Sequence, residues 1–357
     1  MPAPTADEIA RVDVSRQHQD ILALSSQLQD ALWRVDTAEL ESYQPLTKRS
    51  AEDAVLVAGM GGSAVGGDLA AAALGDRLTR PLITVRGYEL PSWATPGSVV
   101  LCSSYSGDTE ETLACYEAAG ALGAARVVAT TGGLLAETAR ADGVRVIGLP
   151  AGLLPRSAVG YMLVSTLEVA AIAGAAPRLR TEIDAASSHL VELAREWAPE
   201  VEPSLPKQIA EQAHGASICI YGAGPTAAIA HRWKTQVNEN AKLPAFSGEL
   251  PEVDHNEIVG WGRAETVGSF LAIFLEDSDQ HPRIRRRIEL TSQLIEPHAA
   301  GSIRVESRGK TPLERLLSLV LLGDLVSVYL AVLQGVDPTP VDVIDRLKVE
   351  LGGPELD

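Results

Sequence analysis

Residues 103–112 read SSYSGDTEET and lie between an apolar run at 98–102 and a helix-like sequence. A hydroxyl-rich turn between a strand and a helix N-terminus is suited to a phosphate, because the free N–H groups and the helix dipole face the anion. Ser104, Ser106 and Thr109 would add uncharged donors. The alternative is an ordinary N-cap, in which Thr109 satisfies only the helix backbone. This turn alone favours neither interpretation.

A second turn, GMGGSA at residues 59–64, follows the apolar run at 54–58. Glycines there would let a ligand approach the backbone closely. The turn does not fit a dinucleotide fingerprint, because no acidic residue follows a second strand in the expected way. It also lacks the Gly-Lys-Ser/Thr ending of a nucleotide-triphosphate loop. Two such turns together shift the balance towards phosphate binding.

Strand and helix segments alternate in two halves of the chain. The first half is predicted to contain strands at 54–58, 82–85, 98–102, 126–129 and 144–147 and helices at 64–74, 109–122 and 134–140. The second half begins with a strand at 217–221 and a glycine turn at 222–226, which we expect to be only a tight connection. This alternation predicts parallel sheets covered on both faces by helices.

The chain of 357 residues is long enough for two domains of ordinary size. Further helices are predicted at 6–33, 181–197 and 312–334, with a boundary at 203–206. The predicted division is an N-terminal helical segment at 1–45, a first domain at 46–178, a linker helix at 179–206 and a second domain at 207–357.

The composition indicates a soluble globular protein, with 46% hydrophobic and 22% charged residues. The net charge of −17 argues against nucleic acid or an anionic membrane as a partner, because both are recruited by basic surfaces. Cys102, Cys115 and Cys219 form neither a disulfide framework nor a zinc motif. The start of the chain does not resemble a secretion signal, and no apolar run is expected to reach the length needed to span a bilayer. We therefore expect a cytoplasmic protein.

Four separated segments resemble the sugar isomerase (SIS) domain superfamily, and specifically the bifunctional phosphoglucose/phosphomannose isomerases. They are GMGGSA at 59–64, SYSGDTEET at 104–112, NENAK at 238–242 and DHNEI at 254–258. The resemblance implies two tandem SIS domains, each a parallel sheet between two layers of helices. It implies a homodimer that converts hexose 6-phosphates without a cofactor or a metal.

The same resemblance implies a set of phosphate-binding residues from both turns. They are Gly62, Ser63, Ser104, Ser106 and Thr109. One departure concerns Asp108, which stands where an Asn is common and would bring a carboxylate near the phosphate. A threonine that lines the sugar site in some relatives has Thr339 as its nearest candidate.

By resemblance, the catalytic base maps to Glu239, the arginine to Arg156 and the lysine near the C-terminus to Lys348, while His255 would reach the site of the partner subunit. Glu239 would move the proton between carbons 1 and 2 through an enediol, and Arg156 would stabilise the enediolate oxygen. His255 would act in ring opening, assisted by Lys348. Each has a plainer alternative: a surface Glu paired with Lys242, a hydrogen-bonded loop His, an arginine bound to an acidic neighbour, and a solvated lysine.

The expected activity is the interconversion of glucose 6-phosphate and mannose 6-phosphate with fructose 6-phosphate through a cis-enediol. A non-catalytic phosphosugar sensor and an isomerase of another phosphosugar are the alternatives. The group Asp254, His255 and Glu257 is the nearest candidate for a metal site, and we rank it below the acid/base role.

Overall fold

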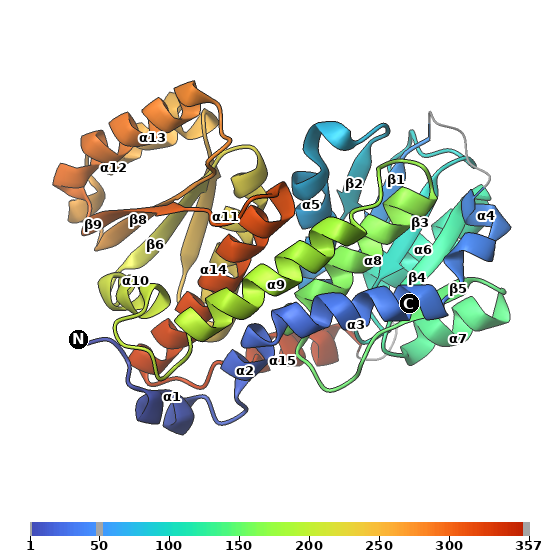
Figure 1. The fold of residues 1–357 in the computed structure, drawn as a ribbon, viewed down its shortest axis with the longest axis horizontal. Coiled ribbons are helices and arrows are strands. Elements are labelled where there is room, and N and C mark those ends of the chain that lie inside the picture. Colours follow the sequence, from blue (N-terminus) through green and yellow to red (C-terminus); the bar gives the residue numbers. More distant parts are fainter. Residues whose placement is uncertain (1, 48–52, 353–357) are drawn as a thin grey trace.

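The computed structural model describes residues 2–47 and 53–352. Two parallel sheets, of order β2-β1-β3-β4-β5 and β7-β6-β8-β9, form two lobes (Figure 1). The first sheet contains β1 (Val55–Ala58), β2 (Leu82–Val85), β3 (Val99–Ser103), β4 (Ala125–Thr130) and β5 (Arg145–Gly148). The second contains β6 (Ser217–Gly222), β7 (Ala245–Glu249), β8 (Phe270–Glu276) and β9 (Gly301–Glu306). Every strand pair is parallel, as predicted from the alternation of strands and helices.

The helices of the first part of the chain are α1 (Ala6–Val12), α2 (Gln17–Leu22), α3 (Leu24–Thr37), α4 (Gln44–Thr47), α5 (Gly61–Leu74), α6 (Glu110–Leu122), α7 (Gly133–Ala141) and α8 (Val159–Ile172). Those of the second part are α9 (Arg180–Glu196), α10 (Leu205–Ala213), α11 (Pro225–Gln236), α12 (Glu257–Trp261), α13 (Pro282–Ile295), α14 (Pro312–Gln334) and α15 (Asp342–Leu351). Short 3₁₀ turns are η1 (Leu40–Ser42), η2 (Gly75–Arg77), η3 (Pro155–Ser157), η5 (Glu252–His255), η6 (Ala264–Thr266) and η7 (Glu296–His298), and η4 (Val237–Ala241) is a π-helical turn.

Alternating side chains of each central strand enter different cores. In β1, Val55 and Val57 join the core beneath α5 and α8, whereas Leu56 joins the core beneath α6 and α7. In β6, Ile218 joins the first of these cores, and Cys219 faces α12 and α13. Both sheets are therefore covered on both faces, which confirms the predicted α/β class. One apolar core also runs continuously through both lobes.

Helix α14 lies at the centre of this shared core (Figure 1). It packs against α9, α10 and α11, and also against α2 and α5. By length and composition it could cross a membrane, with a mean hydropathy of 2.3, so the expectation that no apolar run is long enough was wrong. In the structure, 94% of its apolar window is buried inside the protein. A helix that is apolar all round is also what the core of a large domain requires.

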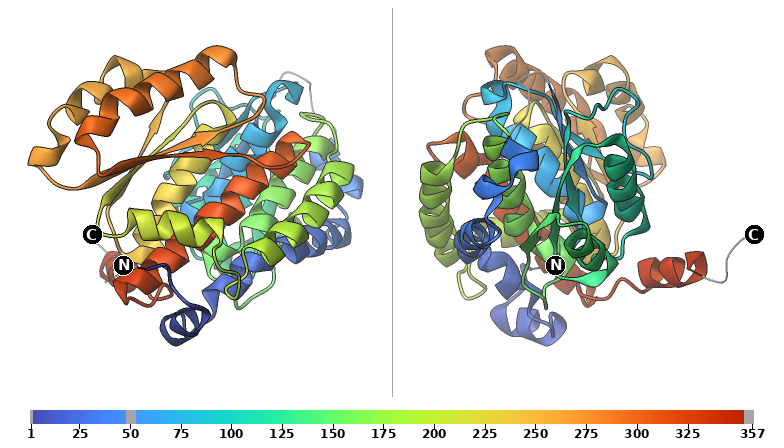
Figure 2. Two further views of the ribbon diagram at one scale, coloured as in Figure 1. Left: turned by 60° about the vertical axis from the view of Figure 1, so that its left-hand side comes forward. Right: turned by 90° about the vertical axis from the view of Figure 1, so that its right-hand side faces the viewer.

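Helix α15 contrasts with α14. None of its residues is buried, and Figure 2 shows it standing out from the body of the molecule. Its start lies close in sequence to Pro338 and Thr339, whose carbonyls contact the candidate site described below.

Candidate active site

The hydroxyl-rich turn connects β3 to α6, and its side chains bond to one another. The Oγ of Ser104 lies 2.8 Å from Oγ1 of Thr109 and accepts a hydrogen bond from the N–H of Gly107 at 3.1 Å. Thr109 occupies the N-cap position of α6, yet its side chain makes no capping hydrogen bond to the helix. The structure therefore does not show the ordinary side-chain N-cap that was the plainer alternative.

The glycine turn between β1 and α5 lies directly beside this hydroxyl-rich turn. Oγ of Ser63 accepts a hydrogen bond from the N–H of Tyr105 at 3.0 Å, and its carbonyl accepts one from Oγ of Ser103 at 2.9 Å. The hydroxyl of Ser106 is at the surface, where it accepts from the N–H of Asp108 at 3.3 Å. Both turns follow the carboxyl ends of neighbouring strands, which is the usual place for ligands in open α/β sheets.

The carboxylate of Asp108 is engaged away from these hydroxyls. Its Oδ1 accepts a hydrogen bond at 2.9 Å from the N–H of Leu134, in the first turn of α7. Helix N-termini stabilise negative charge, so α7 holds this carboxylate in place. The departure from the common Asn is accommodated without leaving Asp108 unpartnered beside the turn.

The equivalent turns of the second lobe are built differently. The hydroxyl of Thr226 accepts from the N–H three residues earlier at 2.8 Å and reaches the carbonyl near the end of β8 at 3.0 Å, so it is used internally. The turn after β8 carries acidic side chains. Asp277 pairs with Arg315 at 2.9 Å, and Glu276 is bound by an arginine of β9. Negative side chains at the turn after β8 disfavour a phosphate there.

Arg156 joins the two lobes. It lies in η3 of the first lobe and is only 3% exposed. Its Nη2 donates to the carbonyls of Pro338 and Thr339 at 2.7 and 2.9 Å, and Nε donates to Oδ1 of Asn240 at 2.7 Å. Nη1 lies 3.4 Å from Oε2 of Glu239. A guanidinium has five N–H donors, so these contacts with described residues leave one Nη1 hydrogen for a further acceptor.

Burial lowers the pKa of the Arg156 guanidinium, and the charges of Glu239 and Asp337 oppose that shift. The ordinary value is 12.5, so the side chain stays positively charged at neutral pH. Thr339, the candidate for the sugar-site threonine, contributes its carbonyl to this arginine.

The backbone of Arg156 is fixed by contacts from both lobes. A β-carbon on Gly62 would lie 2.7 Å from the carbonyl oxygen of Pro155 and 2.8 Å from the N–H of Arg156, so only glycine allows α5 to begin this close. The carbonyl of Arg156 accepts from Nη2 of Arg232 at 2.9 Å. Arg232 in turn forms two hydrogen bonds with Asp324, at 3.0 and 2.6 Å, and both side chains are buried.

Glu239 and Asn240 lie in η4, the π-helical turn that ends α11. Such turns insert an extra residue into a helix and are frequent at functional sites. Asn240 is fully buried and donates from Nδ2 to Oγ of Ser327 at 2.8 Å. The Glu239 side chain is 26% exposed and remains accessible to a ligand. Lys242 bonds to the backbone carbonyls of Glu239 and Pro338, so the alternative of a Glu239–Lys242 side-chain pair is not found.

His255 and Lys348 do not join this cluster within one chain. His255 is exposed at the end of η5, and the structure records no hydrogen bond or ion pair between its side chain and the described residues. Its neighbour Asp254 is bound by Arg287 at 2.8 Å. Lys348 is exposed on α15. Within residues 2–47 and 53–352, no group of three or more His, Cys, Asp or Glu side chains is arranged to hold a metal ion.

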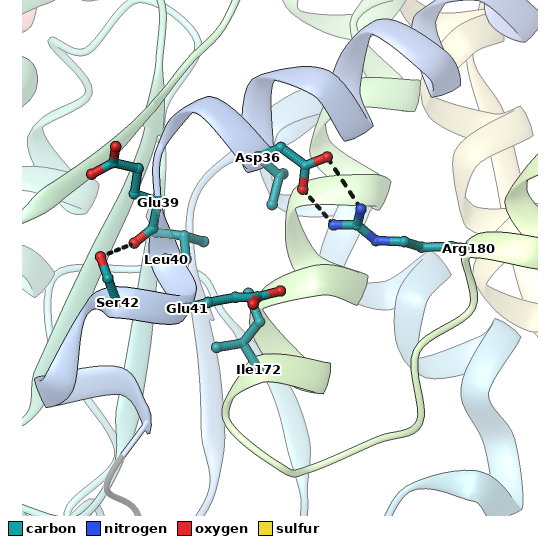
Figure 3. A pocket seen from close by; sticks show the side chains of 8 residues that line it. Asp36, Glu39, Leu40, Glu41, Ser42, Ile172 and Arg180 are labelled. Atoms are coloured by element: carbon teal, nitrogen blue, oxygen red, sulfur yellow. Dashed lines mark hydrogen bonds and ion pairs between the residues drawn. The ribbon is translucent and has the colours of Figure 1, made fainter.

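A separate hollow of about 500 Å³ lies between α3, η1 and the end of α8 (Figure 3). Asp36, Glu39 and Glu41 are among the residues that line it, and their negative charge would repel a phosphate. Its cation, Arg180, is held by Asp36 and by the buried Glu168. This hollow is therefore unsuited to a phosphosugar.

Some contacts of the cluster had no signal in the sequence. Gln17, in the N-terminal helix α2, donates from Nε2 to Oδ1 of Asn240 at 2.8 Å, across 223 positions of sequence. Ser327 lies in the apolar helix α14, and Pro338 lies in the segment that follows it. Neither residue belongs to a motif that would mark it as part of a site. Only the folded chain brings them to Arg156.

Known proteins resemble this chain in sequence and in fold. A family described as the bacterial phospho-glucose isomerase C-terminal SIS domain matches residues 202–351. A bifunctional phosphoglucose/phosphomannose isomerase of Caldicellulosiruptor bescii is 40% identical over 303 residues, covering 84% of this chain and 89% of the relative. The enzyme of the same name from Aquifex aeolicus is 36% identical, covering 83% and 90%. The crystal structure of a hypothetical protein from Thermus thermophilus has a TM-score of 0.73 at 15% identity, covering 97% of this chain and 94% of that protein.

The two parallel sheets, the hydroxyl-lined turns and these similarities define a phosphosugar isomerase of the SIS-domain class. Within that class, the chain belongs to the bifunctional phosphoglucose/phosphomannose isomerase family.

Proposed function

We propose that the protein interconverts glucose 6-phosphate and mannose 6-phosphate with fructose 6-phosphate through a cis-enediol. The observation that carries the proposal is the meeting of Glu239 and Arg156, from opposite lobes, where the backbone of Arg156 lies against Gly62 of the β1–α5 turn. The names and identities of the relatives support the same reaction.

The phosphate would lie at the β1–α5 and β3–α6 turns. Ser63, Ser104, Ser106 and Thr109 supply hydroxyls there, and Gly62 allows the backbone of α5 to approach. These donors carry no charge of their own. Capture of the dianion would therefore depend on hydroxyls, backbone N–H groups and the dipole of α6.

The isomerisation itself requires a base on one face of carbons 1 and 2. In our proposal the Glu239 carboxylate removes the proton from one carbon and returns it to the other. The free Nη1 hydrogen of Arg156 stabilises the enediolate oxygen as negative charge develops there. Glucose 6-phosphate and mannose 6-phosphate differ only at carbon 2 and give the same enediol. One site can therefore serve both sugars.

We propose a homodimer in which His255 of one chain serves the site of its partner in ring opening. The exposure of His255, outside the Arg156 cluster of its own chain, supports this arrangement. Helix α15, which carries Lys348, exposes a set of apolar side chains that a second chain could cover. They are Val343, Ile344, Leu347, Val349 and Leu351. Lys348 would then assist ring opening or hold a sugar hydroxyl.

We also propose a cytoplasmic location and the predicted domain division. The free, buried state of all three cysteines supports a reducing compartment. Residues 46–178 and 207–357 would be the two SIS domains, with 1–45 and 179–206 packing beside them. The match of the SIS family to residues 202–351 supports the limits proposed for the second domain.

The test is formation of fructose 6-phosphate from each aldose phosphate, in the presence of a chelator. Wild type is compared with Glu239→Gln, and Glu192→Gln serves as the control, because that glutamate is exposed on α9. Loss of general base catalysis should lower kcat by about 10²- to 10⁴-fold in Glu239→Gln and leave the control unchanged. Full activity in Glu239→Gln would refute the assignment of the base. Phosphosugar binding without turnover in wild type would favour the alternative of a non-catalytic phosphosugar sensor. Turnover of only a different phosphosugar would favour the alternative of an isomerase for that sugar.

The shared site has its own test. Mixing inactive Glu239→Gln chains with inactive His255→Ala chains should restore some activity, because mixed dimers contain one intact combination of residues. No recovery, although exchange of chains is demonstrated, would contradict the contribution of His255 across the interface.

A further inference from the structure

We propose that Gln17 is a positioning residue for Arg156 and acts through Asn240. The proposal rests on the proposed function and adds a residue from the N-terminal segment to the same site. Gln17 is separated from Asn240 by 223 positions of sequence, and its side chain is only 1% exposed in the structure.

The local backbone directs Gln17 inwards. Residue Arg16 has φ +57° and ψ 40°, a left-handed conformation that a β-carbon disfavours. The carboxylate of Asp13 then fixes the start of α2. It accepts from the N–H of Gln17 at 2.8 Å and from the N–H of His18 at 2.9 Å, and it lies 2.6 Å from the ring of His18. Hydrogen bonds among its own residues thus fix this turn, and Gln17 is directed towards Asn240 of the second lobe.

The chemistry of the network fixes the direction of each amide. A guanidinium can only donate, so Asn240 must present Oδ1 to Nε of Arg156. Its Nδ2 then donates to Ser327, whose hydroxyl donates onward to the carbonyl of Asp324 at 2.6 Å. Gln17 meets the same Oδ1 and must therefore present Nε2. The amide of Gln17 is committed to holding Asn240.

This arrangement leaves Oε1 of Gln17 buried and without a hydrogen-bond partner among the described residues. An unpaired buried acceptor is unfavourable, and such groups are rare in folded proteins. A residue selected only for packing at this point would be apolar. The presence of an amide here is explained if its donor function towards Asn240 outweighs that penalty.

The expected consequence concerns the transition state. Without the donor of Gln17, one restraint on Asn240 is lost, and the plane of the Arg156 guanidinium is less well defined. The free Nη1 hydrogen would then be misplaced relative to the enediolate. No hydrogen bond within residues 2–47 and 53–352 joins the side chain of Gln17 to the phosphate-binding turns, so phosphate binding should be little affected. We expect kcat to fall and KM to change little. Misplacement of a catalytic group by about 1 Å can reduce the rate by about 100-fold.

The experiment compares wild type with Gln17→Met, which keeps the length of the side chain, and with Gln17→Glu, which faces Asn240 Oδ1 with an acceptor. Gln29→Leu is the matched control, because Gln29 lies exposed on α3 and contacts Asp184. Gln17→Met should lower kcat by about 10- to 100-fold and Gln17→Glu by more, with KM within about twofold of wild type. The control should retain full activity.

A double-mutant cycle separates positioning from a general effect on the fold. In an Arg156→Lys background, which has no planar guanidinium to orient, Gln17→Met should change kcat less than twofold. An equal decrease in both backgrounds, a change confined to KM, or a kcat within twofold of wild type in Gln17→Met would overturn the proposal. Active wild type with unaffected Gln17 variants would refute this inference alone. Inactive wild type would refute the proposed function and this inference with it.

Discussion

Replacing Asp324 by alanine should destabilise the protein severely. Asp324 and Arg232 are 2% and 1% exposed and are joined by two hydrogen bonds of 3.0 and 2.6 Å. Removal of the carboxylate leaves a buried guanidinium without its counter-charge, a change that costs about 3–5 kcal/mol. With an unfolding entropy of about 2.1 cal/mol/K per residue, 357 residues give about 0.75 kcal/mol/K. The expected decrease in Tm is therefore about 4–7 °C.

Thermal unfolding followed by circular dichroism measures this decrease. The control is Glu289→Ala, which removes an exposed ion pair with Arg286 and should change stability by less than about 1 kcal/mol. The double variant Arg232→Met with Asp324→Leu removes both charges and should recover most of the lost stability. It should still be less active, because the carbonyl of Arg156 loses its donor. A Tm for Asp324→Ala as close to wild type as that of the control would refute the reasoning.

Two further predictions concern single side chains that form hydrogen bonds. Thr109→Val keeps the shape of the side chain and removes the hydroxyl beside Ser104. In steady-state kinetics, KM for a hexose 6-phosphate should rise by roughly tenfold or more, and kcat should be nearly unchanged. Burial raises the pKa of Asp13, but the stronger combined effect of the hydrogen bonds from His18 and Gln17 lowers it below the ordinary 3.8. Its contribution to stability is therefore present above pH 4 and lost as pH falls through the lowered pKa. The difference in urea midpoint between wild type and Asp13→Asn should shrink below pH 4, and a constant difference down to pH 3 would contradict this account.

The elements that the sequence predicted well are those whose signal is local. The strands of the first sheet are short apolar runs between turn residues, and each lies within one or two residues of its predicted limits. Helix α8 was not predicted, because Val159–Ile172 is apolar on every side and shows no period that distinguishes a helix from a buried strand. Helix α10 begins where a boundary was expected at 203–206. Pro206 suggested an interruption, whereas proline is well tolerated in the first turn of a helix.

The candidate site divides in the same way. The hydroxyls of the β3–α6 turn and the motif around Glu239 could be found in the sequence, because each is a short segment with a distinctive composition. The contacts that fix Arg156 could not. They come from Asn240, from the carbonyls of 338–339 and from Arg232, which are brought together by the packing of the two lobes. The π-helical form of η4 also has no sequence signal, because its residues would equally suit an α-helix.

The position of α14 has a mechanical consequence for how a substrate enters and leaves. The helix belongs to the core of both lobes, so a hinge motion that separated them would bring a long apolar surface into water. The same motion would break the contacts of Arg156 with Asn240 and with residues 338–339. We therefore expect the two lobes to move as one unit during turnover. Substrate entry and product release are then expected to depend on small movements of surface segments.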